Sequence, residues 1–230
     1  MEQKSENKKE KDIVGTVIIA LLLIATLLVL VNTVRLFGVT ANAIAVGAGT
    51  EAGTGITGQS VKVLSSSEVL PQGVPSVYGE ELGIKYDDVS PTNQQLADST
   101  IRKLANYDTS ITLTGSDLEK YKKIGVQISC EYCCGAESII FNNGQAACGC
   151  AHSYAMRGLA KYLITEHPDM TDKQILEEMG KWKVLFFPEI HQQKAAVLKE
   201  KGIEMNYINL ASNKYRGIEQ GASGSMVGGC

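Results

Sequence analysis

Five of the six cysteines lie close together in the chain, and a histidine follows two residues after the last of them. The pattern reads C-x2-C-C, thirteen residues, then C-x-C-x-H. The members are Cys130, Cys133, Cys134, Cys148, Cys150 and His152. Thiolates and imidazoles are the donors that zinc, copper(I) and iron–sulfur clusters use in proteins. With only three histidines in the chain, a metal centre would have to rely on sulfur, and we predict these six residues as ligands.

A predicted hairpin would bring the two groups of cysteines together. Asn142-Asn143-Gly144 lies midway between them, and Asn-Gly is the strongest short hairpin signal because both residues tolerate positive φ. Folding there places Cys130 and Cys133 beside Cys148 and Cys150. His152 would open the following helix, whose amino end favours a thiolate at Cys150.

The same cysteines allow other chemistry. Five thiols and one imidazole exceed the four places that one zinc ion offers, so some of them could form disulfides in an oxidising compartment. The pattern therefore leaves three alternatives: a zinc or copper site, structural disulfides, or a redox-active dithiol. An iron–sulfur cluster fits less well outside the cytoplasm. The sixth cysteine, Cys230, would either stand free or reach back to the cluster.

The amino-terminal region predicts a membrane anchor. Residues 1–12 contain four lysines, and the following stretch from Ile13 to Val34 is uncharged and apolar on all sides. As a helix within residues 13–37, it would be long enough to cross a bilayer. The positive-inside rule then keeps the amino terminus in the cytoplasm and the main domain extracytoplasmic. The alternatives are a cleaved signal, with small-x-small sites between Ala41 and Ala45, and a filament-forming helix.

The rest of the chain predicts one small α+β domain, mostly helical and extracytoplasmic, carrying the cysteine hairpin. Glycine-rich residues 38–77 read as a flexible tether, residues 78–215 as the domain, and residues 216–230 as a flexible tail. Helices are expected over 91–106, 116–123, 151–166, 172–186 and 188–201, the second and fourth opened by the capping boxes Ser116–Glu119 and Thr171–Gln174. Short strands are expected at 111–113 and 203–210.

Other residues with chemical potential have simpler explanations. Met156 and Trp182 fit apolar helix stripes, His167 fits a helix end, and His191 lies among polar residues that suggest a solvated position. No Ser/His/Asp set, phosphate loop or HExxH helix occurs in the sequence, so no catalytic residues are predicted. A net charge of −3 argues against nucleic-acid binding.

Cys148-Gly149-Cys150, followed by His152, resembles the cysteine-glycine-cysteine core of prokaryotic envelope proteins that carry a CYCGC motif. The likeness is local, because Ala146-Ala147 stand where that motif has Cys-Tyr. It implies an envelope thiol site at Cys148, Cys150 and His152. We therefore expect a single-pass membrane protein that holds or transfers zinc or copper, with a metal-donor or metal-acceptor protein as partner; a homo-oligomer would also be compatible. The alternatives are a thiol–disulfide oxidoreductase and a disulfide-stapled surface or filament subunit.

Overall fold

The computed structural model describes residues 65–229, which belong to one compact unit. The predicted membrane segment at 13–37, most of the predicted tether and Cys230 lie outside these residues. Within the described part of the chain, none of the helices combines the length and the apolar character needed to cross a bilayer.

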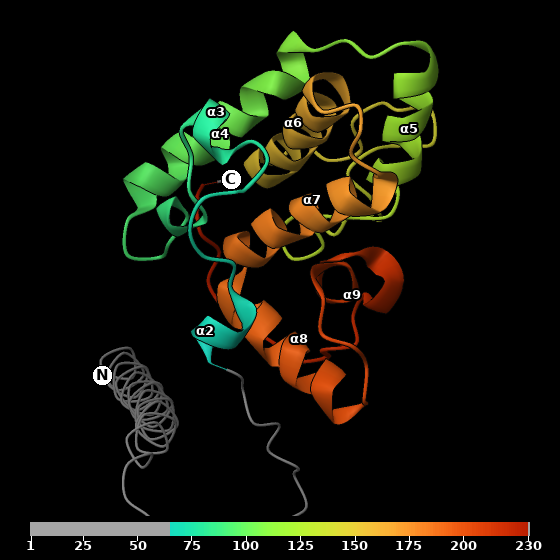
Figure 1. Ribbon diagram of the computed structural model, residues 1–230. Coiled ribbons are helices and arrows are strands. Elements are labelled where there is room, and N and C mark those ends of the chain that lie inside the picture. Colours follow the sequence, from blue (N-terminus) through green and yellow to red (C-terminus); the bar gives the residue numbers. More distant parts are fainter. Residues whose placement is uncertain (1–64, 230) are drawn as a thin grey trace, which may run out of the picture. The chain divides into compact units, whose positions relative to one another are not determined.

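The described residues fold mostly into helices (Figure 1). In chain order these are α2 (Ser66–Val69), α3 (Gly79–Leu82), the 3-10 turn η1 (Tyr86–Asp88), α4 (Gln94–Ser110), α5 (Gly115–Gly125), α6 (Ala151–Glu166), α7 (Asp172–Phe186), α8 (Pro188–Glu200), α9 (Tyr207–Ala211) and the 3-10 turn η2 (Asn213–Tyr215). The long segment between α5 and α6 carries the five clustered cysteines.

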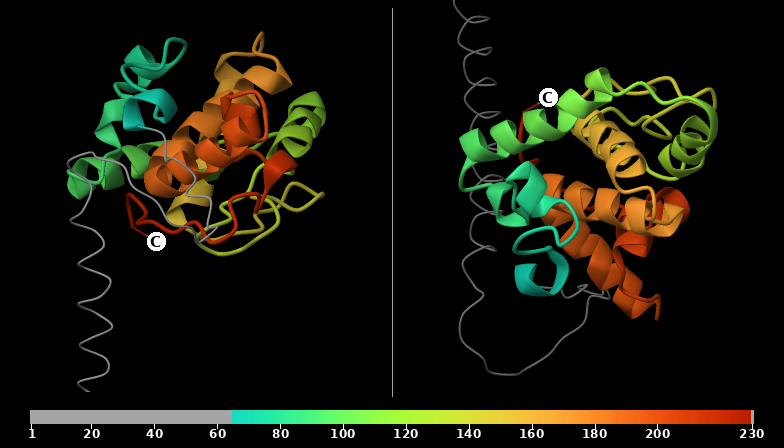
Figure 2. Two further views of the ribbon diagram at one scale, coloured as in Figure 1. Left: turned by 90° about the horizontal axis from the view of Figure 1, so that it is seen from below. Right: turned by 45° about the horizontal axis from the view of Figure 1, so that its top comes forward.

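Helices α4 and α6 cross at close range (Figure 2). Helix α4 buries Ala97, Ile101 and Leu104 on one face, the i, i+4, i+7 spacing of an amphipathic helix. The close crossing depends on Gly158 of α6, because a Cβ placed there would lie 2.0 Å from the backbone oxygen of Leu104. The backbones therefore meet at a point where only a hydrogen side chain fits.

Helix α7 joins the two sides of the core. Trp182 and Phe186 are fully buried on it, as the apolar stripe predicts, and Met156 of α6 is buried in the same cluster. The Trp182 indole donates a hydrogen bond to the Tyr78 hydroxyl at 2.7 Å, and that hydroxyl donates to Glu178 at 2.9 Å. These bonds tie the segment before α3 to the core.

The strand predictions were wrong. Residues 111–113 have no regular structure, residues 203–206 form a loop, and residues 207–210 belong to α9. Across residues 65–229, β structure consists of two isolated bridges, Ile128 with Ser212 and Ile140 with Ala146. The competing signals were helix caps, since Asn206 accepts from the Asn209 backbone N–H and starts α9. The fold is therefore mostly helical with almost no strand.

Cap residues explain where the helix predictions succeeded and failed. Helix α6 has the expected bounds, and Thr171 and Gln174 form the expected capping box. Helix α5 begins after Thr114 instead of using Ser116 as its cap. Helix α4 begins after Asn93, whose side chain accepts from the Leu96 backbone N–H. Leu96 itself is exposed to solvent.

The predicted domain boundaries differ from the structure at both ends. Within the predicted tether, Val69 is already buried against α8 and α9 residues. Within the predicted tail, Val227 is fully buried, and its N–H donates to the Phe186 carbonyl at 2.9 Å. The N–H of Gly229 donates to Asp98 at 2.9 Å. Buried apolar side chains and paired backbone groups fix both segments, which composition alone did not reveal.

Candidate metal and thiol site

The predicted turn between the two cysteine groups is present. Gly144 has φ +87°, and the Phe141 N–H donates to the Gln145 carbonyl across the turn at 2.8 Å. The Ile139 N–H reaches the Ile128 carbonyl at 2.9 Å, so the strand-like arm also lies against the segment that leads into Cys130. Distant parts of the sequence are thereby brought side by side.

The structure places the cysteines in two adjoining groups. Cys134 and Cys148 form a disulfide. Cys130 and Cys150 carry free thiols whose sulfur atoms lie 3.3 Å apart in the core. The Cys150 sulfur belongs to both groups, because it lies within 4.8 Å of a ring nitrogen of His152 and also of both disulfide sulfurs. Cys133 is half-buried and takes no part in the disulfide.

Cys150 is the amino-terminal cap of α6. The Ser153 backbone N–H donates to its sulfur at 3.4 Å, and the Ser153 hydroxyl oxygen lies at the same distance. The hydrogen bond with Cys130 lowers the pKa of Cys150 well below its ordinary value, and His152 and Ser153 act in the same direction against burial. The same bond and burial raise the pKa of Cys130. The pair therefore shares one proton, held by Cys130.

His152 is fully buried and fixed on both sides. Its ring lies 4.6 Å from that of Phe186 and 5.1 Å from that of Phe187, measured between centroids. Its Nε2 lies 2.8 Å from the Val227 carbonyl oxygen. Because a carbonyl oxygen only accepts, Nε2 carries the proton of this hydrogen bond. Metal-binding histidines are usually oriented in this way by a carbonyl on the other nitrogen.

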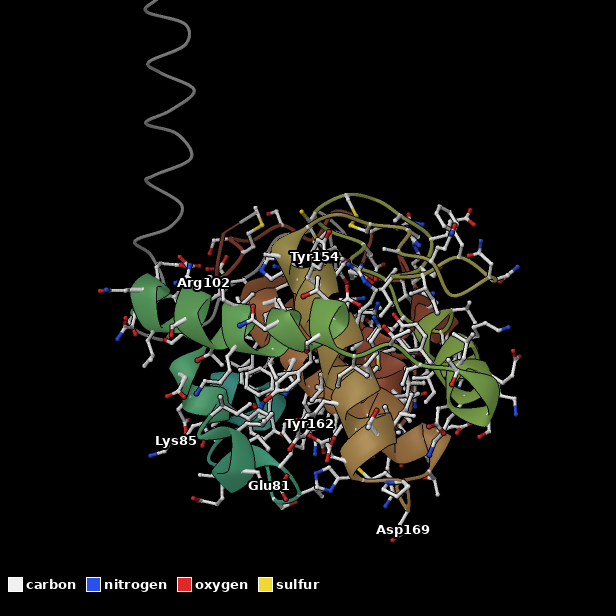
Figure 3. All side chains as sticks on the ribbon, turned by 90° about the horizontal axis from the view of Figure 1, so that it is seen from above. Glu81, Lys85, Arg102, Tyr154, Tyr162 and Asp169 are labelled. Atoms are coloured by element: carbon white, nitrogen blue, oxygen red, sulfur yellow. A yellow bond between two sulfur atoms is a disulfide. The ribbon has the colours of Figure 1, made fainter. Side chains whose placement is uncertain are left out.

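Arg157 holds the second cysteine segment against the helices. The guanidinium is almost completely buried, donates to the Cys148 carbonyl at 2.8 Å and pairs with Asp108 of α4 at 2.7 Å. It also lies over the ring of Tyr154. Figure 3 shows sulfur atoms gathered near the end of α6 that carries Tyr154, away from the end that carries Tyr162.

The carboxy-terminal part of the domain holds the first cysteine segment. Arg216 donates to the carbonyls of Gly135 and Ala136, both at 2.9 Å. The Asn213 side-chain amide donates to the Glu137 carbonyl at 2.8 Å. The loop carrying Cys130, Cys133 and Cys134 is thus fixed by backbone contacts, and its sulfurs have a defined position.

A cluster of buried charges adjoins the thiol pair. Lys183 and Lys194 are fully buried; Lys183 pairs with Glu131 at 2.8 Å, and Lys194 pairs with Glu219 at 3.4 Å. Burial lowers the pKa of Lys183 to about 8, although Glu131 acts against this. Burial alone would raise the pKa of Glu131, but the two ammonium groups lower it. His191, expected in solvent, is fully buried and bonded through Nδ1 to the Phe187 carbonyl.

The chain matches no protein-family model, no curated protein sequence and no solved structure. The resemblance of the Cys148–Cys150 segment to the CYCGC motif therefore stays a prediction, and the argument for function depends on the geometry of the site.

Sequence reasoning found all the thiols but missed the groups that orient them. Arg157 lies between the apolar residues Met156 and Leu159 of α6, and a charged residue at such a position was a usable signal of a buried partner. The contact between His152 and the Val227 carbonyl could not be predicted, because every residue has a backbone carbonyl. Only the packing of the carboxy-terminal segment brings this one to His152. The partition into one disulfide and one thiol pair was equally invisible in the spacing.

Proposed function

We propose that this protein binds one soft metal ion, zinc or copper(I), through Cys130, Cys150 and His152. The proposal depends on the orientation of His152. Its Nε2 is hydrogen-bonded to the Val227 carbonyl, and a ring nitrogen lies within 4.8 Å of the Cys130 and Cys150 sulfurs, which also lie within that distance of each other. All three donors are buried. A buried dithiol with an oriented imidazole suits a metal that prefers sulfur and nitrogen.

The disulfide changes the ligand set expected from the sequence. In this state Cys134 and Cys148 are joined to each other and offer no thiolate, so a site made of all five cysteines would require their reduction. Cys133, which forms the C-x2-C turn with Cys130, lies outside the group of donors within 4.8 Å of one another. It would have to move toward them to supply the fourth donor of a tetrahedral zinc site. Copper(I), which accepts sulfur-rich sites of low coordination number, would not depend on Cys133 to the same extent.

The amino-terminal sequence supports a place for this activity. The apolar stretch at 13–37 with lysines before it favours a membrane-anchored protein whose domain lies in the envelope, where a disulfide beside a metal site persists. We therefore propose metal holding or transfer at the outer face of the membrane, with a metal-donor or metal-acceptor protein as partner.

The test is metal binding by the full-length chain, purified without reductant under anaerobic conditions. We expect one zinc or copper(I) ion per chain by elemental analysis. Replacing Cys150 by serine or His152 by glutamine should weaken binding by about 100-fold or more, measured by competition with a chromophoric chelator, because each removes a donor that the fold has already oriented. Cys133→Ser should weaken zinc binding much more than copper(I) binding.

His191→Gln is the matched control, because His191 is also fully buried but is bonded to the Phe187 carbonyl. It should keep the wild-type affinity. Circular dichroism of each variant shows whether the fold is retained. Full metal occupancy in Cys150→Ser, or failure of the folded wild-type chain to bind either ion, contradicts the proposal.

A further inference from the structure

The thiol pair Cys130 and Cys150 lies next to the Cys134–Cys148 disulfide. The Cys150 sulfur lies 3.3 Å from that of Cys130 and within 4.8 Å of those of Cys134 and Cys148. Neither a structural disulfide nor a separate metal site requires the Cys150 sulfur to lie this close to Cys134 and Cys148. A thiolate so close to a disulfide is instead placed for thiol–disulfide exchange, in which one sulfur attacks another and displaces its partner.

We propose that Cys150 is the nucleophile of an internal thiol–disulfide exchange that moves the disulfide from Cys134–Cys148 to Cys130–Cys150, and so closes the metal site. The metal-site part of this inference rests on the proposed function. The exchange itself depends only on the positions of the four sulfurs.

The exchange takes two steps and needs no external oxidant or reductant. In the first, the Cys150 thiolate attacks the Cys134 sulfur; the Cys150–Cys134 bond forms, the Cys134–Cys148 bond breaks, and Cys148 leaves as a thiolate. In the second, Cys148 takes the proton of the Cys130 thiol. The Cys130 sulfur then attacks Cys150, the Cys130–Cys150 bond forms, and Cys134 leaves as a thiolate. One dithiol has been oxidised and one disulfide reduced.

The surroundings favour this direction of attack. The Cys150 sulfur receives the Ser153 backbone N–H at the start of α6, which stabilises negative charge on the attacking atom. Cys134 is exposed, whereas Cys148, Cys130 and Cys150 are buried. The exchange therefore carries the disulfide into the core and releases one exposed thiol, that of Cys134. The short sulfur–sulfur separation of Cys130 and Cys150 means that their bond can form with little movement.

The exchange and the metal compete for the same two sulfurs. A bound ion would occupy Cys130 and Cys150 and prevent the attack, whereas the metal-free chain could convert both ligands into a disulfide. The site would then release its ion and be closed against another, while Cys134 and Cys148 become available as thiols.

The experiment follows the disulfide by peptide mapping. The full-length, metal-free chain is incubated with iodoacetamide, which captures thiols released at the surface, and is then quenched in acid, digested and analysed by mass spectrometry. We expect alkylated Cys134 to accumulate together with a Cys130–Cys150 disulfide, and the buried Cys148 to be recovered as an unmodified thiol. A saturating amount of zinc or copper(I) should slow this at least tenfold. Cys130→Ser should stop at the Cys150–Cys134 intermediate, and Cys150→Ser should keep the original disulfide.

Cys230→Ser is the matched control, and the disulfide should move in it at the wild-type rate. Loss of exchange in Cys133→Ser would give the attacking role to Cys133 and overturn the assignment. If metal binds but the metal-free chain keeps Cys134–Cys148, the exchange is refuted while the proposed function stands. If the disulfide moves but no metal binds, the proposed function fails while the exchange stands. Equal rates with and without a bound ion would refute the closing of the site.

Discussion

The buried charges beside the thiol pair show how single residues support the site. Lys183 has no exposed surface, and its ammonium is satisfied by Glu131 at 2.8 Å and by the Ala211 carbonyl at 2.8 Å. Glu131 also accepts the Gly217 N–H at 3.0 Å. An ion pair of this kind fixes geometry more than it adds stability, but removing one partner leaves an isolated buried charge.

Replacing Glu131 by glutamine should therefore destabilise the protein by about 3–5 kcal/mol at pH 7, because Lys183 loses its counter-charge. The effect should depend on pH. The pKa of Glu131 is lowered in the folded state, so its contribution to stability is present above the unfolded pKa and is lost as pH falls through the folded pKa. Urea unfolding should show wild type and variant converging as the pH falls through the folded-state pKa of Glu131. A constant gap between them would contradict this role.

At the scale of single residues, the sequence indicated which residue types could react or bind a metal, but it did not indicate which cysteines pair. The six clustered donors were predicted, and Met156 and Trp182 were correctly placed in the core. The position of His191 was misjudged, because a polar neighbour is not always exposed: Lys194 is itself fully buried and ion-paired, and the His191 ring packs on Tyr132 and Phe187. Which cysteines pair depends on sub-ångström placement that spacing cannot provide.

Helices α4 and α6 are the elements that position the second cysteine segment. Asp108 of α4 pairs with Arg157 of α6, and Arg157 holds the Cys148 carbonyl. The contact between these helices at Gly158 thus determines where the disulfide and the α6 cap lie. Any change that separates α4 from α6 should disturb the site as well as the core.

Gly158→Ala tests this dependence. The new Cβ would stand 2.0 Å from the Leu104 backbone oxygen, which cannot rotate away as a side chain would. We expect a loss of about 3 kcal/mol, the upper end for overpacked sites, measured as a lower urea midpoint. Gly149→Ala is the matched control, because nothing lies within 4 Å of its Cβ position, and it should unfold like wild type. Equal stability of the two variants would refute the close crossing.

Elements were predicted well where two signals agreed and poorly where one stood alone. Helix α6 combined an apolar period with a terminal His167-Pro168, and its bounds were correct. Residues 203–210 were predicted as a strand from residue type alone. The Asn206 side chain caps a helix there, so the second half of the segment belongs to α9. A side chain that caps the first turn of a helix outweighs the weak preference of a few residues for a strand.

At the scale of the whole molecule, the site needs segments from across the domain. The cysteines come from the loop between α5 and α6, the ring of His152 packs on Phe186 at the end of α7, and its Nε2 is held by Val227 near the carboxy terminus. The docking of this last segment could not be predicted, because glycine and serine dominate its composition and one buried valine decides its place.

Deleting residues 224–230 should therefore weaken metal binding by about 10–100-fold, because the His152 ring loses the carbonyl that orients it. Val227→Ala keeps that carbonyl and loses only side-chain packing. It should cost roughly 2 kcal/mol in stability and leave metal affinity within about threefold of wild type. Chelator competition and urea unfolding separate the two effects. Unchanged affinity in the deleted chain would show that the carbonyl is not needed.

The distance along the chain between His152 and Val227 has a consequence for biosynthesis. The two are 75 residues apart, so the thiols leave the ribosome well before the segment that orients the imidazole. A nascent chain can already form non-native disulfides or bind ions through its thiols, but it still lacks the Val227 carbonyl that orients His152. On the proposed function, productive loading follows translation of Val227, and chains arrested before it would bind the metal more weakly.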